Sequence, residues 1–461
     1  MSSGIAITAE ARRYALDELL RRAEAPDDFR RTWKIEAGVD GLTLHVAESG
    51  RIDFPSFAAD LNPELAARKA WPFDAPARLA EVVPNFVVPY ARRDSRPNEP
   101  LFMQTSPGFF RCTEDLLAST VLVLSRHEEL DPPYRDAHGR FEAASSLAAR
   151  DGYLDRPIVD EYGLALESVF RAVVPGWKSP SRKLRVKLSH DIDEIGIPFS
   201  PRDVAVQLFS RRSVATGLRD LASGIAPIMP GSLRQVIEIC RIAEEYGLRS
   251  ALYWKSSDPS PYDSGYNVAG SRVAEVMAWA RQRDIEMGVH PGYGTFLAPA
   301  ELRREVDRCR EAVCDERIGG RQHYLRWSPE TWIHWEQCGL AYDSTLGYAD
   351  RAGFRAGTCV PYRPWLWKEN RRADLLEIPL VMMDRTLTSS TYMGLSPDQS
   401  VALLKTLMRR CEAVGGVLTL LWHNNCLGRP FSAYYPRLFA ELAGTENYDW
   451  KQDPLAKVAG A

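Results

Sequence analysis

Two aspartates, Asp191 and Asp193, close a run of alternating apolar and polar residues that begins at Leu184. Side chains of a strand alternate between its two faces, so both carboxylates lie on the face opposite Val186 and Leu188. Neighbouring carboxylates repel each other unless a cation or a proton lies between them. The pair fits a divalent metal site in which one carboxylate is a ligand and the other moves protons, and it fits a solvated acidic turn equally well.

Two later runs end on a histidine in the same way. Residues 285–290 alternate as in a strand up to His290, and Pro291 ends the run because it cannot donate to a ladder. Residues 416–423 form an apolar run that ends on His423. Metal-assisted hydrolysis needs such groups, because a carboxylate and an imidazole hold the ion. A second carboxylate then deprotonates water, and a second imidazole protonates the leaving group.

These motifs and their order resemble the polysaccharide deacetylases, also called NodB-homology carbohydrate esterases. The five matching motifs are His190-Asp191-Ile192-Asp193, His290-Pro291-Gly292-Tyr293-Gly294-Thr295, Arg321-Gln322-His323-Tyr324, Tyr342-Asp343-Ser344-Thr345 and Leu421-Trp422-His423. No single motif is very specific, whereas the ordered set of five is fairly specific and covers residues 183–430. The chain most resembles a divergent bacterial branch of the family that carries an added N-terminal domain.

The resemblance implies catalytic roles for four residues. Asp191 would be the general base and His423 the general acid. Arg321 would orient Asp191, and Asp343 would hold or tune His423, as carboxylates commonly orient catalytic imidazoles. His190 has the same parity as Leu188, so it should face the packing side and act as a buried structural histidine.

Two departures from the family pattern concern the metal. The second metal-binding histidine usually follows the first by four residues, and Gly294 is at that position here. The acidic pair is usually adjacent, and here Ile192 separates the two aspartates. Asp193 and His290 would therefore hold a divalent ion, with Zn as the leading candidate and Co, Ni or Mn as others. His323, another side chain or water would complete the site.

The sequence thus predicts a metal-dependent amide hydrolase, with N-deacetylation of an acetamido sugar or glycan precursor in surface polysaccharide metabolism as the leading reaction. Hydrolysis of another amide or a ureide is the enzymatic alternative. The loss of histidine at Gly294 keeps a non-catalytic carbohydrate-binding relative as a second alternative. The expected partner is a carbohydrate or a small amide. A formal net charge of −3 argues against nucleic acid as a partner.

The elements that position these residues alternate between strand and helix in the second half of the chain. About seven such units predict a parallel barrel-like α/β sheet with functional residues at the carboxyl ends of the strands. The family's distorted (β/α) barrel of seven strands agrees with that expectation. We expect the barrel domain to span residues 181–461. Residues 1–180 would form a smaller α/β or α+β domain, with a helix over 9–24 and an irregular segment over 136–158.

The N-terminal half contains no catalytic motif, and we expect a structural or substrate-orienting role for it. The eight cysteines are scattered without a CxxC pair, which favours reduced thiols. No signal peptide and no apolar stretch of membrane-spanning length are visible in the sequence. We therefore expect a cytoplasmic enzyme, which would act on a sugar nucleotide, a lipid-linked precursor or another small amide.

Overall fold

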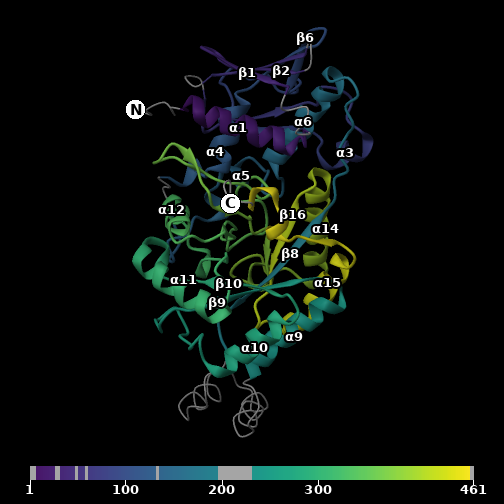
Figure 1. Ribbon diagram of the computed structural model, residues 1–461. Coiled ribbons are helices and arrows are strands. Elements are labelled where there is room, and N and C mark those ends of the chain that lie inside the picture. Colours follow the sequence, from purple (N-terminus) through teal and green to yellow (C-terminus); the bar gives the residue numbers. More distant parts are fainter. Residues whose placement is uncertain are drawn as a thin grey trace.

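The computed structural model of the protein describes residues 7–25, 32–46, 50–57, 61–130, 134–195 and 231–456. In Figure 1, the N-terminal elements form a sheet with helices at one end of the molecule. The later elements form a larger part in which helices surround parallel strands.

The N-terminal sheet has five strands. They are β1 (Lys34–Gly38), β2 (Gly41–Val46), β3 (Gly50–Pro55), β6 (Phe102–Ser106) and β7 (Phe109–Cys112). Their order is β1-β2-β3-β7-β6, and all pairs are antiparallel except the parallel pair of β3 and β7. Leu42, Leu44 and Val46 are buried at alternate positions of β2, so the sheet has one apolar face to cover.

Three helices of this part pack against one another: α1 (Ala9–Arg22), α4 (Leu116–Leu124) and α6 (Ile158–Val173). The first of them is the helix expected near residues 9–24, and Thr8 caps it by accepting a hydrogen bond from the Ala11 amide. The remaining elements are α3 (Ala77–Val82), α5 (Leu147–Arg150) and an antiparallel pair of β4 (Ala66–Lys69) and β5 (Phe86–Pro89). The architecture of this part is α+β.

The larger part contains a parallel sheet of six strands. They are β8 (Arg185–Ile192), β9 (Ser250–Lys255), β10 (Glu286–His290), β15 (Met382–Met383), β16 (Val417–Leu421) and β17 (Glu446–Asn447). The order is β10-β9-β8-β16-β15, and β17 pairs with the first residues of β8. Every residue of β9 and β16 is buried, as is usual for parallel strands that are covered on both faces.

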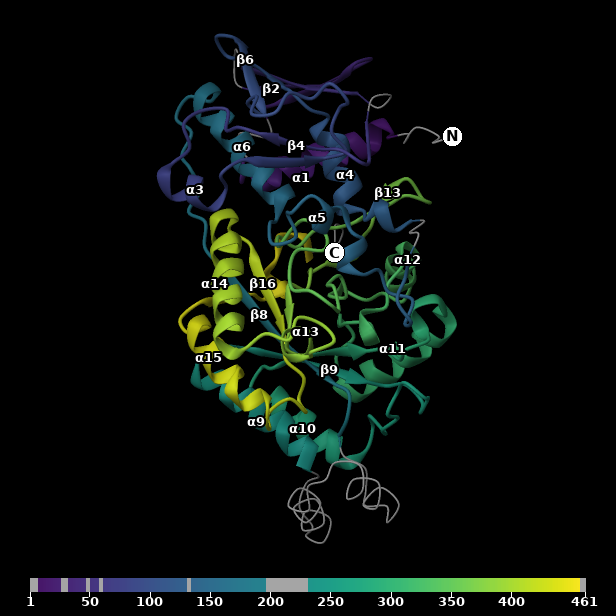
Figure 2. The same ribbon diagram turned by 180° about the vertical axis from the view of Figure 1, so that it is seen from behind.

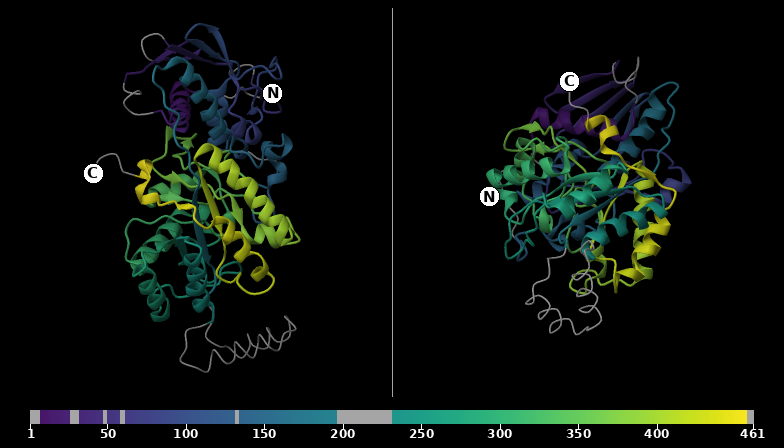
Figure 3. Two further views of the ribbon diagram at one scale, coloured as in Figure 1. Left: turned by 90° about the vertical axis from the view of Figure 1, so that its right-hand side faces the viewer. Right: turned by 60° about the horizontal axis from the view of Figure 1, so that its bottom comes forward.

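Helices cover this sheet on the outside. They are α9 (Gly231–Glu245), α10 (Ser271–Arg281), α11 (Pro299–Val313), α12 (Pro329–Gln337), α14 (Pro397–Val414) and α15 (Tyr435–Leu442). Helices α9, α11 and α14 pack against β9, β10 and β16, and Figures 2 and 3 show α14 and α15 side by side along one flank. Within the described residues, no helix is both long and apolar enough to cross a membrane.

Short segments extend the pairing beyond β10. Strand β11 (Tyr342–Asp343) pairs in parallel with β14 (Leu376–Glu377), while β12 (Trp365–Leu366) and β13 (Arg371–Arg372) form a separate antiparallel pair. Isolated parallel bridges join Val289 to Gly320 and Gly320 to Asp343. A Cβ at Gly320 would lie 1.8 Å from the Val289 carbonyl oxygen, so only glycine permits this approach. These sheets do not by themselves show the closed barrel that the sequence predicts.

The side chains of β8 alternate as the sequence predicts. Val186 and Leu188 belong to the main hydrophobic core. On the opposite face, the Ser189 hydroxyl and the Asp191 carboxylate both accept hydrogen bonds from Nη1 of Arg321, at 3.0 and 2.8 Å. The strand thus separates a face that packs against apolar residues from a face that carries polar groups.

The two parts of the molecule are joined by buried polar contacts. Asp160 of α6 accepts hydrogen bonds from Nε of Arg22 (2.7 Å) and from the Thr358 hydroxyl (2.6 Å). Glu129 forms a buried salt bridge with Arg355 at 2.5 Å. One cluster of buried apolar residues contains members of both parts, and the division near residue 180 stays a prediction.

Candidate active site and metal centre

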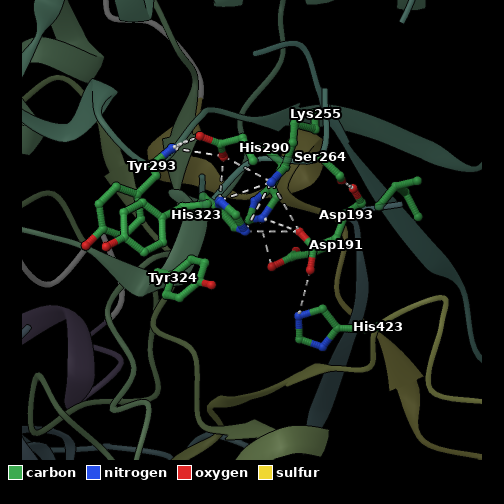
Figure 4. Close-up of polar contacts among 12 residues, drawn as sticks. Asp191, Asp193, Lys255, Ser264, His290, Tyr293, His323, Tyr324 and His423 are labelled. Carbon is green, nitrogen blue, oxygen red and sulfur yellow. Dashed lines mark hydrogen bonds and ion pairs between the residues drawn. The ribbon is translucent and has the colours of Figure 1, made fainter. Parts of the chain in front are cut away.

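Polar side chains from neighbouring strands meet at the carboxyl ends of the parallel sheet (Figure 4). Asp191 is the penultimate residue of β8, Lys255 and His290 end β9 and β10, and His423 follows β16 by two residues. Lys255 and His290 are direct neighbours in the register of β9 and β10. The gathering follows from the parallel topology, because all carboxyl ends of the strands lie at the same edge.

Asp193, His290 and His323 converge on one point. Oδ1 of Asp193 lies 3.2 Å from Nε2 of His290 and 3.4 Å from Nε2 of His323. This oxygen is buried and accepts no hydrogen bond of regular geometry. The ligand atoms of the three side chains lie within 4.8 Å of one another.

The opposite ring nitrogen of each histidine is already bonded. Nδ1 of His290 donates to the Arg321 carbonyl oxygen (2.6 Å), and Nδ1 of His323 donates to Oδ1 of Asp263 (2.7 Å). Both Nε2 atoms face Asp193, and Nε2 of His323 also lies 3.1 Å from Nζ of Lys255. Burial lowers the pKa of His323 to about 4, which keeps that ring neutral. One carboxylate and two oriented imidazoles form a donor set that fits a divalent ion of the zinc type.

The backbone is strained where His323 enters the site. The two residues after it, Tyr324 and Leu325, have left-handed φ angles of 61° and 55°. Such conformations cost on the order of 1–3 kcal/mol each for residues other than glycine, and they persist where tertiary contacts hold them. The turn directs His323 toward Asp193 and places Tyr324 beside His323.

Asp191 is fixed by a buried arginine. Nη1 of Arg321 donates to Oδ1 of Asp191 at 2.8 Å, and the Arg321 side chain is fully buried. Nε and Nη2 of the same guanidinium donate to the carbonyl and hydroxyl oxygens of Ser344, at 2.9 and 3.1 Å. The arginine is thus held in place, and it fixes the position of the Asp191 carboxylate.

His423 takes its carboxylate partner from Asp384, which the sequence reasoning missed. Oδ1 of Asp384 lies 2.8 Å from Nδ1 of His423, and Oδ2 accepts from the His423 amide at 2.6 Å. Burial lowers the pKa of His423, but the Asp384 carboxylate outweighs it, and the pKa rises to about 9. Nε2 of His423 lies 3.7 Å from Oδ2 of Asp193. The imidazole of His423 therefore faces Asp193 at the edge of this cluster.

The expectation that Asp343 holds His423 is wrong. Oδ1 of Asp343 accepts from the Thr345 amide at 2.9 Å and also from the Thr345 hydroxyl. That hydroxyl accepts from the Gln322 amide at 3.0 Å, so Asp343 supports the segment next to Arg321. The physical reason for the difference is strand order: β15 pairs with β16, and the short helix α13 (Asp384–Thr388) directly follows β15.

Lys255 and Asp263 are further site residues that the motifs did not indicate. Nζ of Lys255 is buried and lies 3.2 Å from Oδ1 of Asp263, 3.0 Å from Nδ1 of His323 and 3.7 Å from Oδ1 of Asp193. Burial raises the pKa of Asp263, but its hydrogen bonds from His323 and Ser260 and the Lys255 charge hold it well below its usual range. The only sequence signal for Lys255 is a charge directly after an apolar strand.

One further prediction and one further group of side chains concern the surroundings of the site. His190 is fully buried, as expected for a structural histidine, and its Nδ1 donates to the Trp422 carbonyl oxygen at 2.7 Å. Among the described residues, Asp384, His423 and Cys426 form a second group that could hold an ion. Both oxygens of Asp384 already bind His423, which makes this group less suited to a metal than the triad around Asp193.

Comparison with known proteins gives weak matches. A family model described as a family of unknown function, DUF7033, matches residues 72–175, and no curated protein matches the chain. One similar structure is a provisionally assigned polysaccharide deacetylase from Mycobacterium smegmatis, with 18% identity and a TM-score of 0.39 over 59% of this chain and 87% of that one. Another is a provisionally assigned polysaccharide deacetylase involved in O-antigen biosynthesis from Bordetella bronchiseptica, with 14% identity and a TM-score of 0.28 over 58% and 87%.

A third similar structure is the 4-alpha-glucanotransferase from Thermococcus litoralis. It shares 10% identity and a TM-score of 0.31, over 57% of this chain and 37% of that chain. At these TM-scores the likeness is too weak to assign a family. Function must therefore be argued from the side chains of the site.

A buried carboxyl pair below the site gives a pH-dependent prediction. Asp343 and Glu377 face each other in the register of β11 and β14, and burial raises the pKa of both. A carboxyl group with a raised folded-state pKa favours folding at low pH, and this stability is lost as pH rises through that pKa. Glu377→Gln keeps a hydrogen-bond acceptor for Nε1 of Trp332 and removes the charge. We expect a higher thermal midpoint than wild type at pH 8 and a smaller difference at pH 5.

The matched control is Glu275→Gln, at a position whose side chain is 52% exposed. It should leave the midpoint unchanged at both pH values in scanning calorimetry. A Glu377→Gln protein that is less stable than wild type at pH 8 would show that the ionised carboxylate stabilises the fold.

Proposed function

We propose that the protein is a metal-dependent amide hydrolase that removes the acetyl group from an acetamido sugar or a glycan precursor. The observation that carries the proposal is the convergence of Asp193, His290 and His323 on one point. An arginine-bound carboxylate, Asp191, and a protonated imidazole, His423, lie beside that point. Metal ligands, a base and an acid in one buried cluster are the parts that amide hydrolysis requires.

Each proton-transfer group has a distinct task in this proposal. A divalent ion on the triad, Zn first and Co, Ni or Mn as alternatives, would polarise the amide carbonyl and lower the pKa of water. Asp191, held by Arg321, accepts the proton of the attacking water. His423, held as an imidazolium by Asp384, donates a proton to the leaving amine. Each group is thus held by a partner of opposite charge, Asp191 by Arg321 and His423 by Asp384.

We further propose that the strands close into a distorted barrel of seven segments. Residues 376–383 support this closure, because the Ile378 amide donates to the Asp343 carbonyl oxygen at 2.8 Å and the Val381 amide donates to the Thr419 carbonyl oxygen at 3.1 Å. One segment thus bonds to β11 on one side and to β16 on the other. In this proposal residues 181–461 are the catalytic domain and residues 1–180 are an accessory domain.

The site lies in the cytoplasm in this proposal, and its substrate is a sugar-containing amide available there. All eight cysteines are in described segments and are unpaired, which fits a reducing compartment. Sugar nucleotides and lipid-linked precursors are the substrate forms to test first.

Metal binding should depend on His323 and on the carboxylate behind it. We expect about one divalent ion per chain in the wild type. His323→Ala should weaken Zn affinity by ~10- to 100-fold or more, and Asp263→Asn, which disturbs the orientation of that ring, by ~10- to 100-fold. Competition with a fluorescent chelator measures both.

His334→Ala is the matched control for metal binding. His334 lies on α12, and its Nδ1 approaches the Phe296 carbonyl oxygen at 3.4 Å. This variant should keep wild-type affinity. Equal affinity of the His323→Ala and wild-type proteins would show that the triad is not the metal site.

Proton transfer should be separable from metal binding. Asp191→Asn and His423→Ala should each keep the ion and lower turnover by ~10²- to 10⁴-fold, the usual contribution of a general base or acid. Acetate release from N-acetyl sugar nucleotides and chito-oligosaccharides measures turnover, and elemental analysis measures the ion. If Asp191→Asn strips the metal while Asp193→Asn spares it, the roles of the two carboxylates are reversed.

A further inference from the structure

Four rings gather beside the candidate site and are called here the aromatic wall: His138, Tyr262, Tyr293 and Tyr324. Tyr262 and Tyr293 are stacked, with ring centroids 4.1 Å apart and an interplanar angle of 20°. The His138 ring lies 4.7 Å from that of Tyr324 and 5.9 Å from that of Tyr293. None of the four is fully buried, and Tyr262 is 46% exposed, so the wall is a surface feature and not part of the core.

The aromatic wall is continuous with the proposed metal triad. Tyr324 follows His323 in the chain, and their ring centroids lie 4.6 Å apart. Asp263, the residue after Tyr262, accepts from Nδ1 of His323 at 2.7 Å and from the Tyr293 amide at 3.1 Å. One carboxylate therefore orients a metal ligand and fixes two rings of the wall. Figure 4 shows Tyr293 and Tyr324 on the side of the cluster where His323 lies.

One ring of the wall comes from the N-terminal part of the chain. Arg326 fixes His138 there, because its Nε donates to the His138 carbonyl oxygen (2.8 Å) and its Nη1 donates to the Tyr293 carbonyl oxygen (2.6 Å). The same guanidinium lies 3.9 Å from the Tyr293 ring centroid. Arg140 donates to the Tyr324 carbonyl oxygen at 3.3 Å and pairs with Asp136 at 2.6 Å.

Residues 136–140 are thus bound to the rim of the site by two arginines, although the remainder of the N-terminal part packs elsewhere. A contiguous group of partly exposed aromatic rings marks a candidate ligand-binding groove. Such rings offer an apolar face together with hydroxyl and imidazole groups for hydrogen bonding. A pyranose has the complementary surface, with C–H groups on its faces and hydroxyls at its edge.

We propose that the aromatic wall binds a second sugar ring, next to the acetamido sugar whose amide is hydrolysed. Through residues 136–140, the N-terminal part thereby helps to determine substrate length. The protein should bind glycans of at least two sugars more tightly than a single sugar. This inference rests on the proposed function, since that function places the reacting amide at the metal triad.

Binding of short glycans tests the inference without requiring turnover. Titration calorimetry and saturation-transfer NMR would compare N-acetylglucosamine with its β-1,4-linked disaccharide on the full chain. We expect the disaccharide to bind more tightly. Tyr262→Ala and His138→Ala should each weaken disaccharide binding by about 2- to 10-fold, as loss of one aromatic contact does, and leave the monosaccharide unchanged.

Two further variants sharpen the test. Tyr134→Ala removes a tyrosine that is 71% exposed, just before residues 136–140, and should leave both affinities unchanged. Tyr262→Phe keeps the ring face and should restore most of the affinity. Equal binding of the two sugars, or no effect of Tyr262→Ala and His138→Ala on disaccharide binding, would contradict the proposal that the aromatic wall binds a second sugar. Acetate release from the monosaccharide would in that case still support the proposed function.

Other outcomes separate the two proposals in the opposite direction. If the wild type binds no metal and releases no acetate, yet disaccharide binding depends on Tyr262 and His138, the wall is supported and the hydrolase proposal fails. If the same variants weaken only the binding of a uridine-diphosphate sugar, the wall stacks on a nucleobase, and its assignment to a second sugar is overturned.

Discussion

The site depends on the compensation of several carboxylate charges, which lie together at one edge of a buried sheet. Removing one charged group from water costs on the order of several kcal/mol, so a cluster of carboxylates is stable only if each is paired or hydrogen-bonded. The carboxylates concerned are Asp191, Asp193, Asp263 and Asp384. Arg321 pairs with Asp191, His423 pairs with Asp384, and Lys255 together with His323 pairs with Asp263. Asp193 lies farther from its cationic neighbours, at 3.7 Å from both Nζ of Lys255 and Nε2 of His423. Its Oδ1 is buried without a regular hydrogen bond, and two imidazoles face it.

This pattern of charges also explains why Asp191 is proposed as the base and His423 as the acid. The Arg321 guanidinium holds Asp191 in place, and Asp191 is the group that accepts a proton in the proposed reaction. An imidazole on a buried carboxylate stays protonated and can donate one, as the pKa of about 9 for His423 indicates. Asp191 and His423 lie at the carboxyl ends of the neighbouring parallel strands β8 and β16. The topology of the sheet thus brings the proposed base and the proposed acid to the same edge.

The residues that alternation and strand ends predict are those that the structure brings together. Asp191 and His290 lie in the last two residues of β8 and β10, and Asp193 and His423 closely follow β8 and β16. Parallel strands bring these ends to one edge of the sheet. The sequence did not predict Asp384 as a site residue, because the preceding strand β15 has only two residues and shows no periodicity. Asp343 was assigned the role of holding His423 because Tyr342-Asp343-Ser344-Thr345 resembles the family's Asp motif. Chain order does not reveal that β15, and not β11, lies next to β16.

The sequence also did not predict Lys255, Asp263 or residues 136–140 as parts of the site, for related reasons. Asp263 lies in a turn whose position depends on contacts with His323 and with the Tyr293 amide, which are distant in sequence. Residues 136–140 have no regular periodicity, and only tertiary contacts through Arg326 and Arg140 bring them to the site. The sequence predicted the parallel α/β sheet and helix α1 in outline.

The central claim is that the ion binds where Asp193, His290 and His323 converge. Anomalous diffraction from Zn-soaked crystals, recorded on both sides of the Zn absorption edge, tests it most directly. The account predicts one strong peak at ~2.0–2.2 Å from Oδ of Asp193 and from Nε2 of both histidines. A peak at Asp384, His423 and Cys426 instead, or no peak at the triad in fully loaded crystals, would contradict it.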